Sequence, residues 1–373
     1  LPVLTPSLMA VTILTFITGL SATSAPLLVG GQDFQTITPM ILTFANNVSS
    51  RPLAALLALF LGVATIILLT IMIQIEKRGH YMSVSKVKTT IVKQKIRNPI
   101  LNVLAHVYAY LLFLIYVIPV ALVVLFSFTD SATIASKHLT LSSFTLENYI
   151  SIFQKASSYK PFVVSIAYSA IAASFVAIIV LIACRILQKR KDRLGGALEY
   201  GLLIPWLLPT TLMALGLITT YNTPRVWMFN KVLTGTSVIM LIGYIIIKIP
   251  FTLRMTKAAF FSLDDSLEDA ARNMGAKPFY TFMRVQLPII LPTVLAIFAL
   301  NFNGLLGDYD MSVFMYHPLN KPLGVYIKSL TDSETNADNA ALTFVYAVLM
   351  MIISAIVMYL VYGRGNKVDK SKD

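Results

Sequence analysis

The sequence predicts an all-α integral membrane protein with eight transmembrane helices. Three observations carry this prediction: 57% of the 373 residues are apolar, only 13% are charged, and the mean hydropathy is +0.75. A soluble domain carries about twice that share of charged residues. Because so much apolar surface cannot be hidden inside small soluble domains, it needs lipid as its solvent.

Each predicted span is a run of about 20 mostly apolar residues, which is the length that crosses a bilayer. Isolated prolines and glycines inside such a run are tolerated in membrane helices. The eight runs cover residues 6–23, 53–75, 101–128, 161–187, 197–221, 234–253, 287–306 and 341–363.

The basic residues indicate which side of the membrane each loop faces. Of the 30 lysines and arginines, 22 fall in alternate loops and the tail, with Lys248 counted among them, and 8 fall on the other side. Cytoplasmic loops carry the excess of Lys and Arg. We therefore expect the chain in the cell membrane with both termini cytoplasmic, and we expect no nucleic-acid partner despite the net charge of +13.

Metal-binding and disulfide chemistry have little support in the sequence. Cys184 is the single cysteine, so no disulfide can form within the chain. His106, His138 and His317 are scattered, without the spacing of a metal site. We predict no metal site.

The loop between the sixth and seventh runs, residues 261–288, is named the signature loop below. Asp264 or Asp265 is placed to cap a short helix of about residues 265–274, and Glu268 is placed to reach back to an Asp265 cap. Gly275 is a natural terminator. Pro278 suits the first turn of a second helix, which we expect to run to Pro288.

Small residues on the first of these helices indicate close contact with another surface. Ala271 and Gly275 lie four residues apart on one face, beside Ala270, while Leu267 and Met274 offer apolar contact. These features favour a docking element for a partner protein. The alternative is that the helix packs against the membrane helices of its own chain.

The signature loop resembles the cytoplasmic motif of binding-protein-dependent ABC importer permeases, which have a type I, maltose-transporter-like membrane fold. That motif is Glu-Ala-Ala, three residues, Gly, nine residues, Ile, one residue and Leu-Pro. The corresponding residues, at the same spacing, are Asp269, Ala270, Ala271, Gly275, Val285, Leu287 and Pro288. Asp for Glu and Val for Ile are conservative departures.

The resemblance implies that the loop couples the chain to a separate ATPase. The implied coupling residues are Asp265, Leu267, Glu268, Asp269, Ala270, Ala271, Met274, Gly275, Leu287 and Pro288. Implied partners are a cytoplasmic ABC ATPase dimer, an extracellular or periplasmic substrate-binding protein and the lipid bilayer. The sequence contains no G-x-x-x-x-G-K-[ST] motif. We therefore expect no enzyme activity and no bound cofactor in this chain, with ATP and Mg used by the partner.

An internal repeat bears on the start of the chain. Leu1 and Pro2 match Leu287 and Pro288 at an offset of 286 residues, and Pro6 matches Pro292 at the same offset. We therefore expect the chain to begin inside a longer, fused two-half permease. Residues 1–75 would be the last two helices of a first half, residues 76–98 a basic cytoplasmic linker, and residues 99–373 a complete second half.

The substrate is predicted by resemblance alone. Fused two-half permeases of this type resemble those for ferric iron, with thiamine, polyamines and inorganic or organophosphorus anions as alternatives. Polar residues stand out near the seventh run as a candidate substrate path: Asn301, Asn303, Asp308, Tyr309 and Asp310. They could equally be ordinary helix-end and loop residues. A secondary transporter driven by an ion gradient is the alternative from another class.

Overall fold

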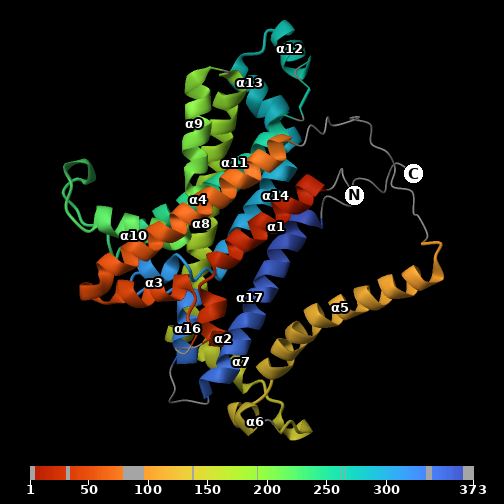
Figure 1. The fold of residues 1–373 in the computed structure, drawn as a ribbon, viewed down its shortest axis with the longest axis vertical. Helices are drawn as coiled ribbons and strands as arrows, with labels where there is room; N and C mark the ends of the chain where they lie inside the picture. The colour runs from red at the N-terminus through yellow and green to blue at the C-terminus, as the bar shows by residue number, and fades with distance from the viewer. Residues whose placement is uncertain are drawn as a thin grey trace.

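The computed structural model describes residues 5–30, 34–78, 96–136, 138–190, 192–261, 263–264, 266–332 and 338–363. These residues form helices and turns, with two isolated β-bridges and no strand among them. The prediction of an all-α membrane protein is confirmed (Figure 1). Leu1, Pro2, the centre of the predicted linker, Asp265 and the basic tail after Gly363 lie outside the described residues.

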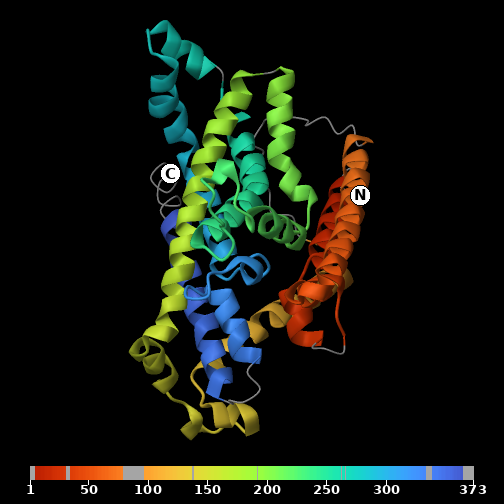
Figure 2. The ribbon, with the colours of Figure 1, turned by 90° about the vertical axis from the view of Figure 1, so that its left-hand side faces the viewer.

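The first helices of the chain pack as a unit of their own, drawn in red and orange in Figure 2. This unit comprises α1 (Thr5–Leu20), α2 (Ser24–Gly30), α3 (Ile37–Asn46), the 3₁₀ turn η1 (Val48–Ser50) and α4 (Arg51–Arg78). Its core joins Ile41 of α3 to Ala54, Ala58 and Leu61 of α4. The four-residue spacing from Ala54 to Ala58 gives α4 a narrow face of small residues, which lets α3 approach closely.

The second group of helices contains the longest helix and the signature loop. Its elements are α5 (Pro99–Ser127), α6 (Ser131–Ser136), η2 (Leu141–Ser143), α7 (Glu147–Gln154), α8 (Ala156–Lys189), α9 (Arg193–Leu203), η3 (Ile204–Leu207), α10 (Thr210–Tyr221), η4 (Val226–Met228), α11 (Ser237–Phe261), α12 (Ser266–Asn273), α13 (Pro278–Thr281), the π turn η5 (Phe282–Gln286), α14 (Leu287–Leu306), α15 (Ser312–Met315), α16 (Leu323–Asp332) and α17 (Asp338–Tyr362). Its contacts with the first group include α10, which packs on α3 and α4, and η3, which packs on α4.

Helix α8 is the central element of this group and packs against both α11 and α14. Its buried stripe includes Ala172, Ala173, Val176 and Val180, all fully inaccessible. Small and β-branched residues on this face allow the neighbouring helices to come close. In Figure 2, α8 runs through most of the height of the molecule.

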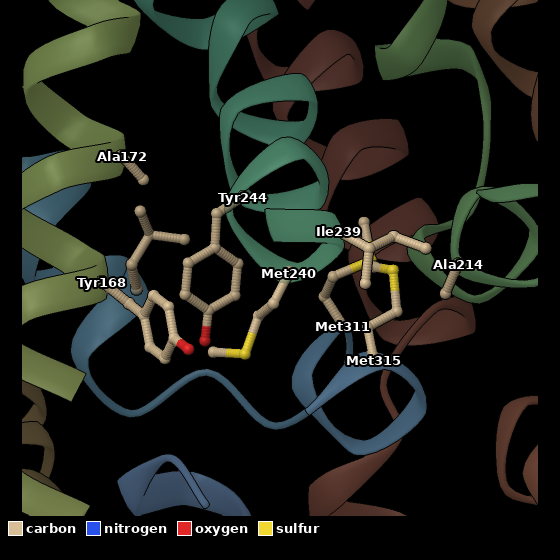
Figure 3. Packing of buried hydrophobic residues seen from close by; sticks show 9 residues of the cluster. Tyr168, Ala172, Ala214, Ile239, Met240, Tyr244, Met311 and Met315 are labelled. Carbon is tan, nitrogen blue, oxygen red and sulfur yellow. The ribbon is translucent and has the colours of Figure 1, made fainter. Parts of the chain in front are cut away.

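A cluster of buried apolar residues joins α8, α10, α11 and the segment around α15 (Figure 3). Tyr168 of α8 lies next to Tyr244 of α11, with Met240 beside them, and Met311 and Met315 lie beside Ile239 in the same cluster. Gly243 makes room for this packing, since a Cβ atom there would come within 2.6 Å of the Met315 methyl group. The segment around α15 therefore packs closely against α11 and the other helices of this cluster.

Six helices of the described chain are long and apolar enough to cross a membrane. They cover Arg51–Leu68, Pro99–Ser127, Ala156–Lys189, Ser237–Phe260, Pro278–Leu306 and Asn339–Tyr362. The predicted count of eight is not confirmed. The first predicted run, 6–23, corresponds to α1, whose 16 residues rise about 24 Å and so fall short of the roughly 30 Å hydrocarbon core.

The fifth predicted run, 197–221, is broken rather than straight. Its two parts, Arg193–Trp206 and Thr210–Tyr221, meet at 104°. Pro205 and Pro209 flank the break. Because a proline lacks the N–H that would continue the helix, two of them four residues apart turn the chain. The pair counts as a span only if it is treated as one bent element.

Helix α5 stands apart from the other helices (Figure 1) and packs along α17. Asn98 caps it, because Asn98 Oδ1 accepts hydrogen bonds from the N–H groups of Ile100 and Leu101 at 2.9 and 3.3 Å. Apart from Ser127 at its end, none of its residues is buried. An apolar helix with so little protein cover presents its surface to lipid or to another protein segment.

We predict that Gly324→Ala lowers the melting temperature of the detergent-solubilised protein. A Cβ atom at Gly324 would lie 2.5 Å from the Asp308 carbonyl oxygen and 2.8 Å from that of Gly307. Both neighbours are backbone, so the cost should be about 1–3 kcal/mol of overpacking. Gly216→Ala is the matched control, because nothing lies within 4 Å of its Cβ position. Equal melting temperatures for the two variants would contradict the prediction.

Candidate functional site

The signature loop projects at one end of the molecule, where α12 lies beyond the ends of the membrane helices (Figure 1). The expected helix of about residues 265–274 is observed as Ser266–Asn273. Asp264 Oδ1 accepts a hydrogen bond from the Ser266 N–H at 2.9 Å, which starts the helix. Glu268 and Asp269 lie in the first turn and Arg272 in the last, as the helix dipole favours.

Gly275 ends α12 as the sequence predicts. Its φ of +82° is left-handed, a conformation that glycine adopts without steric cost. The Gly275 N–H donates to the Arg272 carbonyl at 2.9 Å and the Ala276 N–H to the Ala271 carbonyl at 3.0 Å. These are the two hydrogen bonds of a Schellman motif. The chain then turns back toward the membrane helices.

The second helix of the loop differs from the expectation that it would run to Pro288. It begins at Pro278 as expected, but it continues through the π turn η5 and α14 to Leu306. The Leu287 N–H donates to the Phe282 carbonyl, five residues back. Pro288 and Pro292 therefore lie inside a helix. The wider turn displaces the carbonyl groups that the ring of Pro288 would otherwise strike.

Helix α12 has two distinct faces. Ala271 is buried at 4% exposure and Glu268 also faces the membrane helices, whereas Leu267 and Met274 are exposed. Met274 is 82% and the following Phe279 75% exposed. Large apolar side chains concentrated on a projecting loop are typical of protein contact surfaces. One face of α12 is therefore held against α8 of its own chain, and docking of a partner on the exposed face stays a prediction.

Glu268 is held in its charged form by the basic end of α8. It accepts hydrogen bonds from Arg185 at 3.1 Å and from Lys189, and Arg272 lies 3.8 Å away. Burial alone would raise the pKa of Glu268, but the hydrogen bonds and charges of Arg185 and Lys189 outweigh it and lower that pKa to about 2. The expected contact of Glu268 with an Asp265 cap involves a residue outside the described part of the chain, so it stays a prediction.

A polar stripe follows one face of α11, the helix that leads into the signature loop. Tyr244, Lys248 and Thr252 lie at four-residue intervals, so they share this face. The Tyr244 hydroxyl is 2.6 Å from Ser312 Oγ, and Asn301 Nδ2 donates to Thr252 Oγ1 at 2.7 Å. These bonds join α11 to α14 and α15 at two levels.

Lys248 provides a third level of this stripe. It interacts electrostatically with Asp308. Gly304 accommodates it, because a Cβ atom there would lie 2.9 Å from Lys248 Nζ. The count of basic loop residues therefore included one lysine that lies within α11, where its charge needs a partner inside the protein.

Asp308 also organises the turn after α14. It accepts hydrogen bonds from the Met311 N–H at 3.3 Å, the Ser312 N–H at 3.1 Å and Ser312 Oγ at 2.8 Å. Through these bonds it starts α15, much as an N-cap residue does. Asn301 and Asp308, two of the five candidate path residues, thus have structural partners.

The other three candidate path residues, Asn303, Tyr309 and Asp310, line one cavity of ≈680 Å³ together with Asp308. Lys328 of α16 and Met350 of α17 also contribute to its wall. Asn303 Oδ1 is buried without a hydrogen-bond partner among the described residues. A cavity of this volume is in the range of small-molecule sites.

In the described part of the chain, no three His, Cys, Asp or Glu residues lie close enough together to hold a metal ion.

Three residues of the site were missed by the sequence reasoning: Arg185, Gln286 and Lys248 as an internal partner. Gln286 is 3% exposed. A glutamine and an arginine beside an apolar run carry no local sign of their partners.

The sequence of this chain matches the model of a known protein family. A family model described as "binding-protein-dependent transport system inner membrane component" matches residues 176–365, just over half of the chain. The chain belongs to this family. The match includes the signature loop and all the residues that line the cavity.

Curated relatives of this permease agree with that assignment. The probable ABC transporter permease protein y4fN of Sinorhizobium fredii is 37% identical over 360 residues, which are 96% of this chain and 62% of the relative. The chain thus spans less than two thirds of the length of that protein. A putative 2-aminoethylphosphonate transport system permease protein, PhnV of Salmonella paratyphi A, is 24% identical over 57% of this chain and 78% of its own.

A solved structure shares the fold of the permease. It is a bacterial alginate ABC transporter in complex with an alginate pentasaccharide-bound periplasmic protein. The alignment covers 72% of this chain and 94% of the other, with a TM-score of 0.59 and 14% identity. At that identity the likeness concerns the fold alone.

We predict that replacing Lys248 or Asp308 destabilises the permease by about 1–3 kcal/mol, because the remaining residue loses the electrostatic attraction between the two. Lys248→Met and Asp308→Asn should each lower the melting temperature in detergent. The double variant should lose less than the sum of the two losses, since the attraction between the two residues can be lost only once. Lys231→Met, at an exposed loop position, should change little. Strict additivity would contradict the prediction.

The pKa of Glu268, about 2, predicts the pH range of its ion pairs. A carboxylate with a lowered pKa adds stability above its usual pKa, and this stability is lost only as the pH falls toward 2. In infrared spectra, the carboxylate band that disappears in Glu268→Gln should persist from neutral pH to about pH 3. Protonation between pH 4 and 5 would show that the pairs with Arg185 and Lys189 do not form.

Proposed function

We propose that this permease is the membrane subunit of an ATP-driven importer that moves a small solute into the cytoplasm by alternating access. The exposed face of the signature loop carries the proposal. Leu267, Met274 and Phe279 present apolar surface at the end of the molecule, and this surface is suited to a groove of an ATPase subunit. Family membership supports the same role.

The chemical step belongs, in this proposal, to a separate ATPase dimer that uses ATP and Mg. The sequence lacks the phosphate-binding loop that would hold the nucleotide. Closure of the ATPase dimer would push on α12, and the membrane helices would switch between inward- and outward-open arrangements. The chain itself is a transport subunit rather than an enzyme.

The opposite end of the molecule is proposed to face outward and to receive a substrate-binding protein. The excess of basic residues on the side of the signature loop supports a cytoplasmic position for that loop. The alginate transporter, whose fold is similar, is known in complex with a periplasmic protein. The family description, "binding-protein-dependent", supports the same partner.

The substrate proposal remains a small charged solute that reaches the cavity beside α14. Resemblance to fused two-half permeases favours ferric iron, whose hard charge suits the carboxylate of Asp310 and the phenol of Tyr309. The relative named for 2-aminoethylphosphonate favours the organophosphorus alternative. Asp310 and Lys328 carry opposite charges in the same cavity wall, which suits an amine and a phosphonate on one molecule.

Uptake into cells that express the full transporter distinguishes these substrates. Radioactive ferric citrate and 2-aminoethylphosphonate should be offered separately, with and without Asp310→Asn. Iron uptake that depends on Asp310 would support ferric iron. Phosphonate uptake that is reduced by both Asp310→Asn and Lys328→Met would support the zwitterion. Uptake driven by an ion gradient without any ATPase would contradict the importer proposal and favour a secondary transporter.

We predict that Met274→Asp abolishes co-purification of the ATPase. A charge at the centre of an apolar contact costs about 2 kcal/mol or more, which is more than tenfold in affinity. Leu319→Asp is the matched control, since Leu319 is a similarly exposed apolar residue in the turn after α15, distant from the signature loop. The control should retain the ATPase. If Met274→Asp also retained it, the exposed face of α12 would not be the docking surface.

A further inference from the structure

The signature loop is joined to α8 by a ring of three polar side chains. Arg185 Nη1 donates to Glu268 Oε2 at 3.1 Å and to Gln286 Oε1 at 2.9 Å. Gln286 Nε2 closes the ring by donating to the same Glu268 Oε2 at 3.1 Å. Three elements therefore meet at one point: the end of α8, helix α12 and the π turn before α14.

The ring is shielded from water. The side chains of Arg185 and Glu268 are only 16% and 13% exposed, and the Arg185 guanidinium lies over the Phe282 ring at 5.8 Å from its centroid. Lys189 adds a second ion pair to Glu268. Exposed ion pairs contribute little, whereas shielding and multiple hydrogen bonds strengthen a pair. This contact is therefore firmer than an ordinary surface salt bridge.

Helix α12 has no comparable second attachment in the described residues. Every ion pair that these residues form between α12 and the membrane helices involves Glu268. The remaining charged pair, between Arg272 and Glu268, lies within α12 itself. The ion pairs that hold α12 to α8 in the described residues thus all depend on one carboxylate, Ala271 is also buried, and Leu267 is exposed.

At its other end, α8 is tied to the segments opposite the signature loop. Ser165 Oγ accepts a hydrogen bond from the Leu323 N–H of α16 at 2.7 Å. The Tyr346 hydroxyl of α17 donates to the Ser158 carbonyl oxygen at 2.8 Å. Helix α8 therefore connects the polar ring to the far end of the molecule (Figure 2).

We propose that the Arg185–Glu268–Gln286 ring is the joint through which displacement of the signature loop is passed to α8. Glu268 is then a positioning residue that acts inside the permease, and it is not a contact for the ATPase. The proposal rests on the proposed function, in which an ATPase displaces the loop. With the ring intact, α8 must follow α12; with the ring broken, α12 moves without it.

A fluorescent label at the far end of α8 tests the joint without knowledge of the substrate. Ser157→Cys, at an exposed position of α8, is labelled with an environment-sensitive dye in a Cys184→Ser background. The full permease is purified with its ATPase, and the change in fluorescence on adding ATP and vanadate is measured. Glu268→Gln and Arg185→Met should each reduce this change about fivefold or more, while ATPase co-purification stays at the native level.

Three further variants sharpen the test. In the double variant Arg185→Met, Glu268→Gln, the fluorescence change should be no smaller than in the single variant with the smaller change. The reason is that either single substitution already breaks the ring. Arg185→Lys keeps a cation and should recover part of the response. Arg272→Met is the matched control, because Arg272 is 66% exposed and 3.8 Å from Glu268, and it should respond as the native protein does.

Distinct results would overturn the joint and the proposed function. A full response in Glu268→Gln, or loss of ATPase binding in step with loss of response, would refute the joint and leave the importer proposal standing. A native complex whose label does not respond to nucleotide would also refute the joint. Failure of the native permease to bind any ATPase would refute the proposed function itself. If Glu268→Gln failed to assemble, Arg185→Met would decide the test, because it removes the direct hydrogen bonds and ion pair between α8 and Glu268.

Discussion

The absence of water from the bilayer interior is the constraint on which this structure depends. Backbone groups satisfy it within helices, and the few polar side chains satisfy it by pairing across helices. Tyr244, Lys248 and Thr252 do so along one face of α11. Because their partners lie on α14 and on the turn after it, the two helices that flank the signature loop are fastened together at several depths.

The signature loop could be predicted closely because its signals are local. A cap beside Ser266, a glycine with positive φ at position 275 and a proline at the next helix start are all fixed by residues a few positions apart. The inward direction of Glu268 is a different matter. Its partner Arg185 is 83 residues away in the chain, and no periodic pattern connects the two.

The membrane helices show the same division between local and distant information. Average hydropathy located six long helices, but it does not report where a helix bends. It therefore predicted one span where Arg193–Trp206 and Thr210–Tyr221 meet at 104°. It also left Lys248 among the loop residues, since nothing nearby reveals Asp308 as its partner. The polar residues near α14 were found from the sequence. Their division into structural bonds for Asn301 and cavity wall for Asn303 required the fold.

The π turn before Pro288 has a consequence for the angular phase of the two segments that it joins. An α-helix rotates by about 100° per residue, and a π turn holds one residue more than an α turn. The extra residue sets how far α12 is rotated about the axis of α14, and hence which side of the loop meets Arg185. The number of residues between Gly275 and Pro288 therefore determines the angle at which α12 points away from the axis of α14. A single deletion there would leave every side chain of α12 in place on its own helix but aim the loop in another direction.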